Sequence, residues 1–273
     1  KEQGRRPEAR LDGRGVLLAL LAFPAILLAL SEGEEQGWGS PIVLILAAVG
    51  IISLIAFVRV ELPQREPLLQ LRLFASPMFA LGMVINFITQ FSLFGMQYVM
   101  PLMLQQVHQL GAARTGLILF PSGILSFVTM NISGRIYNRT GPRPLAVTGL
   151  SVLLGTTFWL SRLGPTASLG LITVLGSLRG LAMGLCMMPV QTAAYNTVPR
   201  ELMTRATALS NVLFRIFGAT TTAVLTTILL LGLSLQGAPA GSNVTSGSTP
   251  IPLLSNAFGG AFLAMAVMAG VGI

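Results

Sequence analysis

Eight long apolar segments, separated by short polar connections, constrain this sequence more than any other feature. They cover residues 15–31, 41–58, 78–104, 114–133, 145–163, 168–191, 207–235 and 254–273. A helix needs about 20 mostly apolar residues to cross a bilayer, and a helix satisfies its own backbone polar groups there. The segments therefore predict an all-α, polytopic membrane protein with eight transmembrane helices and the lipid bilayer as its surroundings.

Composition agrees with this fold class. Charged residues make up only 10% of the 273 residues, against about 25% in soluble domains. Most of the chain therefore lacks a surface that water could solvate.

Basic residues are concentrated on alternate connections. Arginines occur in residues 1–14, 59–77, 134–144 and 192–206. By contrast, the only charged residues in 32–40 are glutamates, and residues 164–168 and 236–253 carry no charge. The positive-inside rule places the Arg-rich connections, including the amino-terminal segment 1–14, in the cytoplasm. The net charge of +8 is then a topology signal, and we expect no nucleic-acid partner because no basic run is interleaved with aromatic residues.

Patterns typical of enzymes and of metal sites are missing from the sequence. The single Cys186 and the single His108 provide neither a disulfide within the chain nor a metal-ligand cluster. No nucleophile stands in a pattern with a base, and no Gly-rich phosphate loop is followed by Gly-Lys-Ser/Thr. We therefore expect neither an enzyme nor a bound cofactor or metal.

The stretch GRIYNRTGPRP at 134–144 resembles the cytoplasmic signature loop, G-x-x-x-D-R-x-G-x-R, of the major facilitator superfamily. Gly134 would permit close helix approach and Gly141 a tight reversal of the chain. The resemblance implies a gating role for Arg139 and Arg143, whose contacts with acidic groups or helix ends can form in one conformation and break in another. Asn138 stands where the family often has Asp, so a strong ionic latch is not expected there.

Further short matches occur in the same order along nearly the whole chain. They are Asp12–Gly15, Ala29–Ser31, Gly37-Trp38, Phe57-Val58 with Glu61, Pro67-Leu68, Leu73-Phe74, Leu93–Gly95, Met100–Gln105, Gly116-Leu117, Phe120–Gly123, Arg179–Gly184, Pro189, Val198-Pro199 and Ala206–Asn211. Together they resemble the carboxyl-terminal part of the fourteen-helix drug:proton antiporter branch, the EmrB/QacA type.

That resemblance implies an organisation and an activity. Residues 15–77 would be a linker pair of transmembrane helices with a cytoplasmic loop, and 78–273 a six-helix bundle whose last helix is truncated. The missing amino-terminal six-helix bundle of the same chain would be its partner. The implied function is proton-coupled efflux of hydrophobic or cationic small molecules by alternating access in a bacterial plasma membrane, with the proton gradient as energy source. Two alternatives remain: transport of another solute, such as a metabolite or siderophore, and an inert membrane fragment.

Polar side chains inside the segments are candidates for lining a substrate cavity, because such groups are costly in lipid. Asn86, Gln90 and Gln97 lie within about 40° of each other on one helix face, with Phe94 close by. The alternative role for these amides is hydrogen bonding between helices.

Two later segments add further candidates. Asn211, Arg215 and Thr222 share a face of segment 207–235, and Arg179 lies midway along 168–191. No Asp or Glu lies deep in any segment, so the partner of Arg179 would be a backbone carbonyl, water, substrate or a group in the missing bundle. In the same segment, Gly176, Gly180 and Gly184 share one face, which favours close helix packing.

Overall fold

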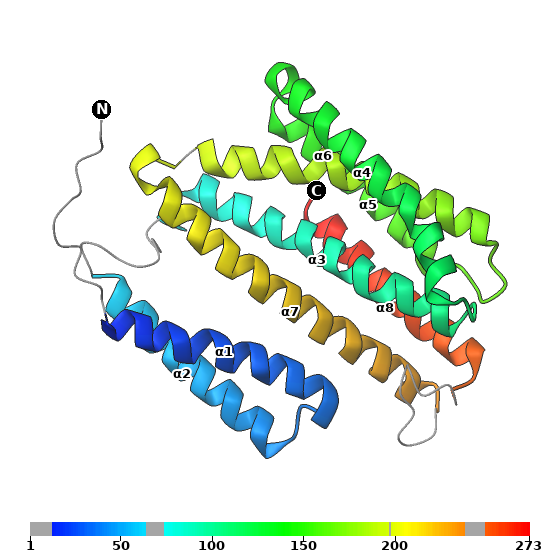
Figure 1. Ribbon diagram of the computed structural model, residues 1–273, viewed down its shortest axis with the longest axis horizontal. Coiled ribbons are helices and arrows are strands. Elements are labelled where there is room, and N and C mark those ends of the chain that lie inside the picture. The colour runs from blue at the N-terminus through cyan, green and yellow to red at the C-terminus, as the bar shows by residue number, and fades with distance from the viewer. Residues whose placement is uncertain (1–12, 64–73, 197, 238–248) are drawn as a thin grey trace. The chain divides into compact units, whose positions relative to one another are not determined.

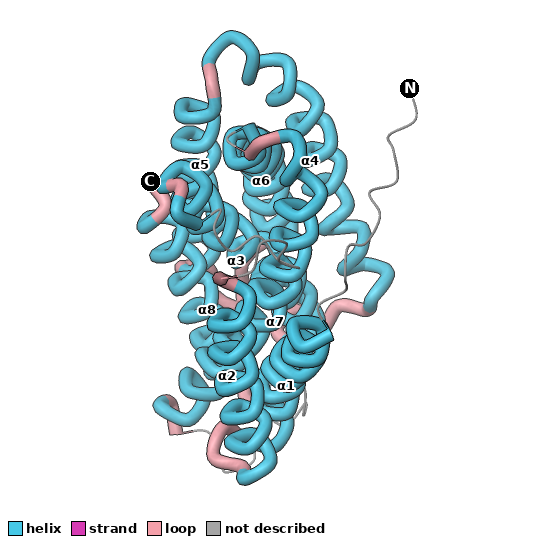
Figure 2. Tube along the Cα trace, turned by 90° about the vertical axis from the view of Figure 1, so that its left-hand side faces the viewer, coloured by secondary structure: helices cyan, strands magenta, loops and turns pink. Residues whose placement is uncertain are grey.

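The computed structural model describes residues 13–63, 74–196, 198–237 and 249–273. Figure 2 shows these residues as helices joined by short loops, without a strand among them. The long helices are α1 (Gly13–Gln36), α2 (Pro41–Glu61), α3 (Pro77–Gln106), α4 (Ala112–Thr140), α5 (Pro142–Ser161), α6 (Leu169–Asn196), α7 (Met203–Leu235) and α8 (Ile251–Val271), with the short helix η2 (Arg200–Leu202) before α7. Each of the eight is long and apolar enough to cross a membrane. The predicted fold class is confirmed.

Most of the helices extend beyond the apolar segments that predict them. The clearest case is α4, which continues through residues 134–140 to Thr140. The prediction of a loop over 134–144 is therefore wrong, because a helical backbone continues into the polar region once its hydrogen-bond ladder is established. Gly141 alone separates α4 from α5, with a φ of +77° that favours glycine.

Two exposed arginines lie at helix ends, although the predicted alternation of basic and uncharged connections does not include them. The sequence prediction places Arg114 and Arg162 inside spans. The structure has Arg114 in the first turn of α4 and Arg162 at the carboxyl-terminal cap of α5, both at the ends opposite to Gly141. The alternation of basic and uncharged connections is therefore less complete than the sequence predicts.

The chain divides into two compact units. The first comprises residues 1–77 and 198–219, and the second comprises residues 78–197 and 220–273. Helix α7 contributes its amino-terminal half to the first unit and its carboxyl-terminal half to the second. The predicted segment 1–14 and the connection 59–77 lie largely outside the described residues.

In the first unit, α1 and α2 pack against each other as a helical hairpin. The backbone turns at Gly37, which has a φ of +85°. Phe23 and Phe57 meet edge to face, with ring centroids 6.0 Å apart. Many other large apolar side chains of both helices are exposed, as expected of surfaces that lipid would cover.

Among the described residues of the second unit, two apolar clusters contribute to the core. The larger one joins α3, α5, α6, α7 and α8 and includes Met100, Leu225 and Phe262. The smaller one joins α3, α5, α6 and α8 around Leu153 and Cys186. Thr226 of α7 also donates a hydrogen bond of 2.9 Å to the Tyr98 hydroxyl of α3. Figure 1 shows α4, α5 and α6 side by side within this unit.

Helices α4 and α6 approach closely at two of the three predicted glycines. A Cβ atom on Gly180 would overlap the backbone oxygen of Ser122, and one on Gly184 would lie 2.7 Å from the backbone oxygen of Ser126. Ser133 strengthens the contact by donating a 2.9 Å hydrogen bond to the carbonyl of Gly184. Gly176 differs, because a Cβ there would meet no atom within 4 Å, so the packing prediction is wrong for this glycine.

Candidate substrate-binding site

Arg179 is the most deeply buried charged side chain of the second unit that the structure describes. Its exposed fraction is 2%. The guanidinium donates hydrogen bonds to the Thr157 hydroxyl of α5 and to the backbone carbonyl of Ser92 in α3, and a further one of 2.7 Å to the Ser92 hydroxyl. Of the partners predicted for Arg179, the structure contains a backbone carbonyl, and it adds two hydroxyl groups.

These acceptors are all neutral. A guanidinium carries five N–H groups, and the described residues provide these three acceptors. By sequence, no Asp or Glu occurs anywhere in residues 78–197 or 220–273. The second unit thus holds a buried positive charge without a carboxylate of its own, an arrangement that is costly in a low-dielectric interior.

Arg179 also lines a pocket between α3, α4 and α6, which we call the α3–α4–α6 pocket. Its volume is about 440 Å³, within the range of small-molecule sites. The lining residues are Leu93, Met96, Gln97, Leu119, Ser122, Gly123, Ser126, Phe127, Met130, Gly176, Arg179, Gly180 and Met183. Most are apolar, and the absence of a side chain at Gly176 leaves part of the space open. An apolar wall with a few polar groups is typical of ligand sites.

The predicted stripe on α3 divides between this pocket and the protein interior. Gln97 is exposed and lines the pocket. Asn86 and Gln90 are buried, with exposed fractions of 3% and 4%. In the part of the chain that the structure describes, the Asn86 Nδ2 and Gln90 Oε1 atoms have no hydrogen-bond partner. Phe94 is half-buried and is not among the lining residues.

The α7 candidates fall in different units. Asn211 and Arg215 lie on the half of α7 that belongs to the first unit, and both are exposed. Thr222 lies on the half that belongs to the second unit, and it is half-buried. None of the three lines the α3–α4–α6 pocket, and their role in a cavity stays a prediction.

The predicted gating residues surround the α4–α5 turn. Arg139, in the last turn of α4, and Arg143, in the first turn of α5, are both exposed. A Cβ on Gly134 would meet no described atom within 4 Å, so the expected close helix approach is not present there. Gly141 does provide the predicted reversal through its positive φ. The side chain of Asn138 lies outside the described residues.

Ser92 and Thr157 are site residues that sequence reasoning misses. Both are neutral hydroxyl residues on other helices, 87 and 22 positions from Arg179. Because the apolar segments contain no Asp or Glu, the sequence indicates that a buried Arg179 needs neutral hydrogen-bond acceptors. It does not indicate which residues provide them. No cluster of three or more His, Cys, Asp or Glu among the described residues could hold a metal ion.

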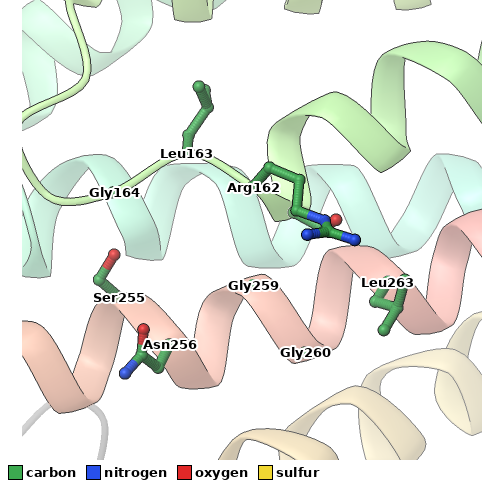
Figure 3. Close-up of a pocket in the computed structure, with 9 residues that line it drawn as sticks. Arg162, Leu163, Gly164, Ser255, Asn256, Gly259, Gly260 and Leu263 are labelled. Atoms are coloured by element: carbon green, nitrogen blue, oxygen red, sulfur yellow. The ribbon is translucent and has the colours of Figure 1, made fainter.

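A second pocket, of about 390 Å³, lies between the carboxyl-terminal end of α5 and the first half of α8 (Figure 3). It contains Arg162, whose guanidinium lies 5.1 Å from the centroid of the Phe158 ring. Arg162 is exposed, and its cation–π contact with Phe158 helps to stabilise its positive charge at the helix end. This pocket lacks a buried functional group of the kind that Arg179 provides.

The eight membrane-length helices of the described residues define a helical, multi-pass membrane protein, and the α3–α4–α6 pocket beside Arg179 is its candidate site. The sequence profile of the Major Facilitator Superfamily matches residues 13–222. The chain belongs to this superfamily, and the resemblance seen in the sequence is confirmed.

Relatives that are named for drug resistance or drug export point to one branch of the superfamily. The lincomycin resistance protein LmrB of Listeria monocytogenes is 35% identical over 223 residues, covering 82% of this chain and 47% of that protein. The uncharacterized MFS-type transporter YcnB of Bacillus subtilis is 32% identical over 266 residues, covering 97% of this chain and 54% of that protein. The multidrug export protein EmrB of Haemophilus influenzae is 29% identical over 218 residues, covering 79% and 43%. These matches support the drug-exporter branch, and the chain spans about half the length of these curated relatives.

Proposed function

We propose that this chain is the substrate-binding, carboxyl-terminal part of an exporter of hydrophobic small molecules. The observation that carries the proposal is the α3–α4–α6 pocket, an apolar cavity with Gln97 and Arg179 as polar groups. Such a pocket receives an apolar molecule by burial and orients it by a few hydrogen bonds. Relatives named for lincomycin resistance and multidrug export support a drug-like cargo.

The full transporter, in this proposal, comprises a second bundle supplied by the rest of the protein. The two bundles rock about the substrate, and the Arg-rich end with Arg139 and Arg143 faces the cytoplasm. The proton gradient supplies the energy. Because residues 78–197 and 220–273 contain no carboxylate, the proton-carrying acid lies outside the second unit.

The test is an efflux assay with the complete gene. Inverted membrane vesicles from cells that express it should accumulate a hydrophobic fluorescent compound when a proton gradient is present. They should lose it when nigericin and valinomycin collapse the gradient. Accumulation that persists after collapse would contradict proton coupling. No accumulation of any compound in a panel of neutral, cationic and anionic molecules would contradict the exporter function and favour an inert fragment.

A further inference from the structure

Arg179 places a positive charge in the wall of the α3–α4–α6 pocket, and the sequence of the second unit contains no carboxylate to match it. We infer that Arg179 binds the carboxylate or another anionic group of the cargo, so that this transporter carries amphipathic organic anions. The inference rests on the proposed function and deepens it. It also replaces the expectation of cationic cargo for this part of the protein.

The first step of the argument is the charge of the second unit. Residues 78–197 and 220–273 contain six arginines, no lysine and no acidic residue. The five arginines other than Arg179 are exposed, namely Arg114, Arg135, Arg139, Arg143 and Arg162. Water or lipid headgroups can solvate the charges of those five side chains. Arg179 alone is buried, and burial without a counter-charge is the costly case.

The second step is the geometry around the guanidinium. Hydrogen bonds from Arg179 to Ser92 and Thr157 tie it to two neighbouring helices. The group is therefore held in one orientation before any ligand arrives, which reduces the entropy cost of binding. It has more N–H groups than these acceptors use, and a planar guanidinium matches the two oxygens of a carboxylate.

The third step is the rest of the pocket. Leu93, Met96, Phe127 and Met183 provide apolar wall around Arg179. An aromatic or aliphatic body fits against these side chains while its anionic group meets the guanidinium. A cationic molecule of the same size would be repelled, because Arg179 carries the same charge and the lining residues include no carboxylate.

A matched pair of probes tests the inference on the full-length protein in lipid nanodiscs. The probes are 1-naphthaleneacetate and 1-naphthaleneacetamide, which share a ring and differ in the charge of the side group. At neutral pH the acid should bind at least about tenfold more tightly than the amide, as expected of one charge-assisted hydrogen-bonded pair. Isothermal titration calorimetry measures both dissociation constants.

Variants locate the preference. In Arg179→Gln the acid and the amide should bind with nearly equal dissociation constants, while binding of the amide is retained. Arg179→Lys should keep part of the preference for the acid because the positive charge remains. Arg162→Gln removes an exposed arginine of the same unit and should leave the ratio unchanged.

Equal or absent binding of the two probes to the wild-type protein would overturn the inference. A counter-charge from outside the second unit would then be what stabilises the buried charge of Arg179. An unchanged acid preference in Arg179→Gln would overturn it as well. The proposed function fails separately, if vesicles with the complete protein accumulate no compound at all. Vesicles that accumulate neutral or cationic dyes, in a protein without the acid preference, would sink only the anion inference.

Discussion

Two glutamines on the same face of α3 have different surroundings: one lies in the pocket and the other in the protein interior. Gln97 is exposed in the pocket, whereas the Oε1 atom of Gln90, two turns earlier, is buried and has no partner among the described residues. An unpartnered buried acceptor contributes little to stability and costs desolvation energy. The two glutamines should therefore respond differently to replacement.

We expect Gln97→Ala to change the relative efflux of different compounds by several-fold at equal expression, because one orienting polar group of the pocket is lost. Gln90→Leu should leave the melting temperature unchanged or raise it. Efflux of a compound panel and thermal unfolding in detergent measure the two effects. A drop in stability of about 1–3 kcal/mol for Gln90→Leu would reveal a buried water or partner on Gln90.

His108 gives a second prediction at this scale. It follows α3, and burial lowers its pKa below the ordinary value by disfavouring the charged imidazolium. The folded state therefore binds the proton less readily than the unfolded state. Stability should be constant above the ordinary histidine pKa of about 6.5 and should fall as the pH decreases from there towards the lower folded-state pKa.

His108→Gln should flatten this acid-side decrease, as measured by thermal unfolding between neutral and mildly acidic pH. The imidazole NMR signal that is absent from His108→Gln identifies His108 and can be followed as the pH changes. A titration midpoint at or above the ordinary value would contradict the effect of burial.

At the scale of elements, the contact between α4 and α6 depends on missing side chains. Gly180→Ala should destabilise the protein by roughly 1–3 kcal/mol, because the new Cβ overlaps the backbone of Ser122, which cannot rotate away. Gly176→Ala is the matched control on the same helix. It has no atom within 4 Å, and alanine favours a helix by up to about 1 kcal/mol over glycine. Equal melting temperatures for the two variants would contradict the close contact at Gly180.

Much of this level of structure could be predicted from the sequence, and the reasons are physical. Apolar segments predict all eight helices because lipid requires length and hydrophobicity of any helix that crosses it. The same signal ends where charge begins, so it misses the polar last turns of α4 up to Thr140. Glycine spacing predicts a packing face, but the crossing of the helices decides which glycine contacts a neighbour. Gly180 contacts the backbone of Ser122, whereas a Cβ on Gly176 would meet no atom within 4 Å, and Gly176 lines a pocket.

The site was less accessible from sequence. Arg179 could be selected because charge inside an apolar segment is costly. Its partners Ser92 and Thr157 could not, because serine and threonine on a helix more often bond to their own backbone. Thr156, next to Thr157, does this with the carbonyl of Val152. Only the three-dimensional packing of α3, α5 and α6 distinguishes the two cases.

At the scale of the whole molecule, the two ends of α4 provide a test of gating. Arg139→Ala should lower proton-driven efflux at least about fivefold without loss of expressed protein, if its contacts form in one conformation and break in another. Arg114→Ala, an exposed arginine at the other end of the same helix, is the control and should leave efflux unchanged. Vesicle efflux with quantified protein measures both. Equal efflux by the wild type and Arg139→Ala would remove Arg139 from the gating mechanism.

The single residue between α4 and α5 also limits how the molecule can move. Two helices of 29 and 20 residues meet at Gly141, and Pro142, which begins α5, has its own φ fixed by its ring. Relative rotation of the two helices therefore has almost no degrees of freedom beyond the two dihedral angles of one glycine. Any change in the angle between α4 and α5 would therefore be absorbed at Gly141, which acts as a hinge between the two helices.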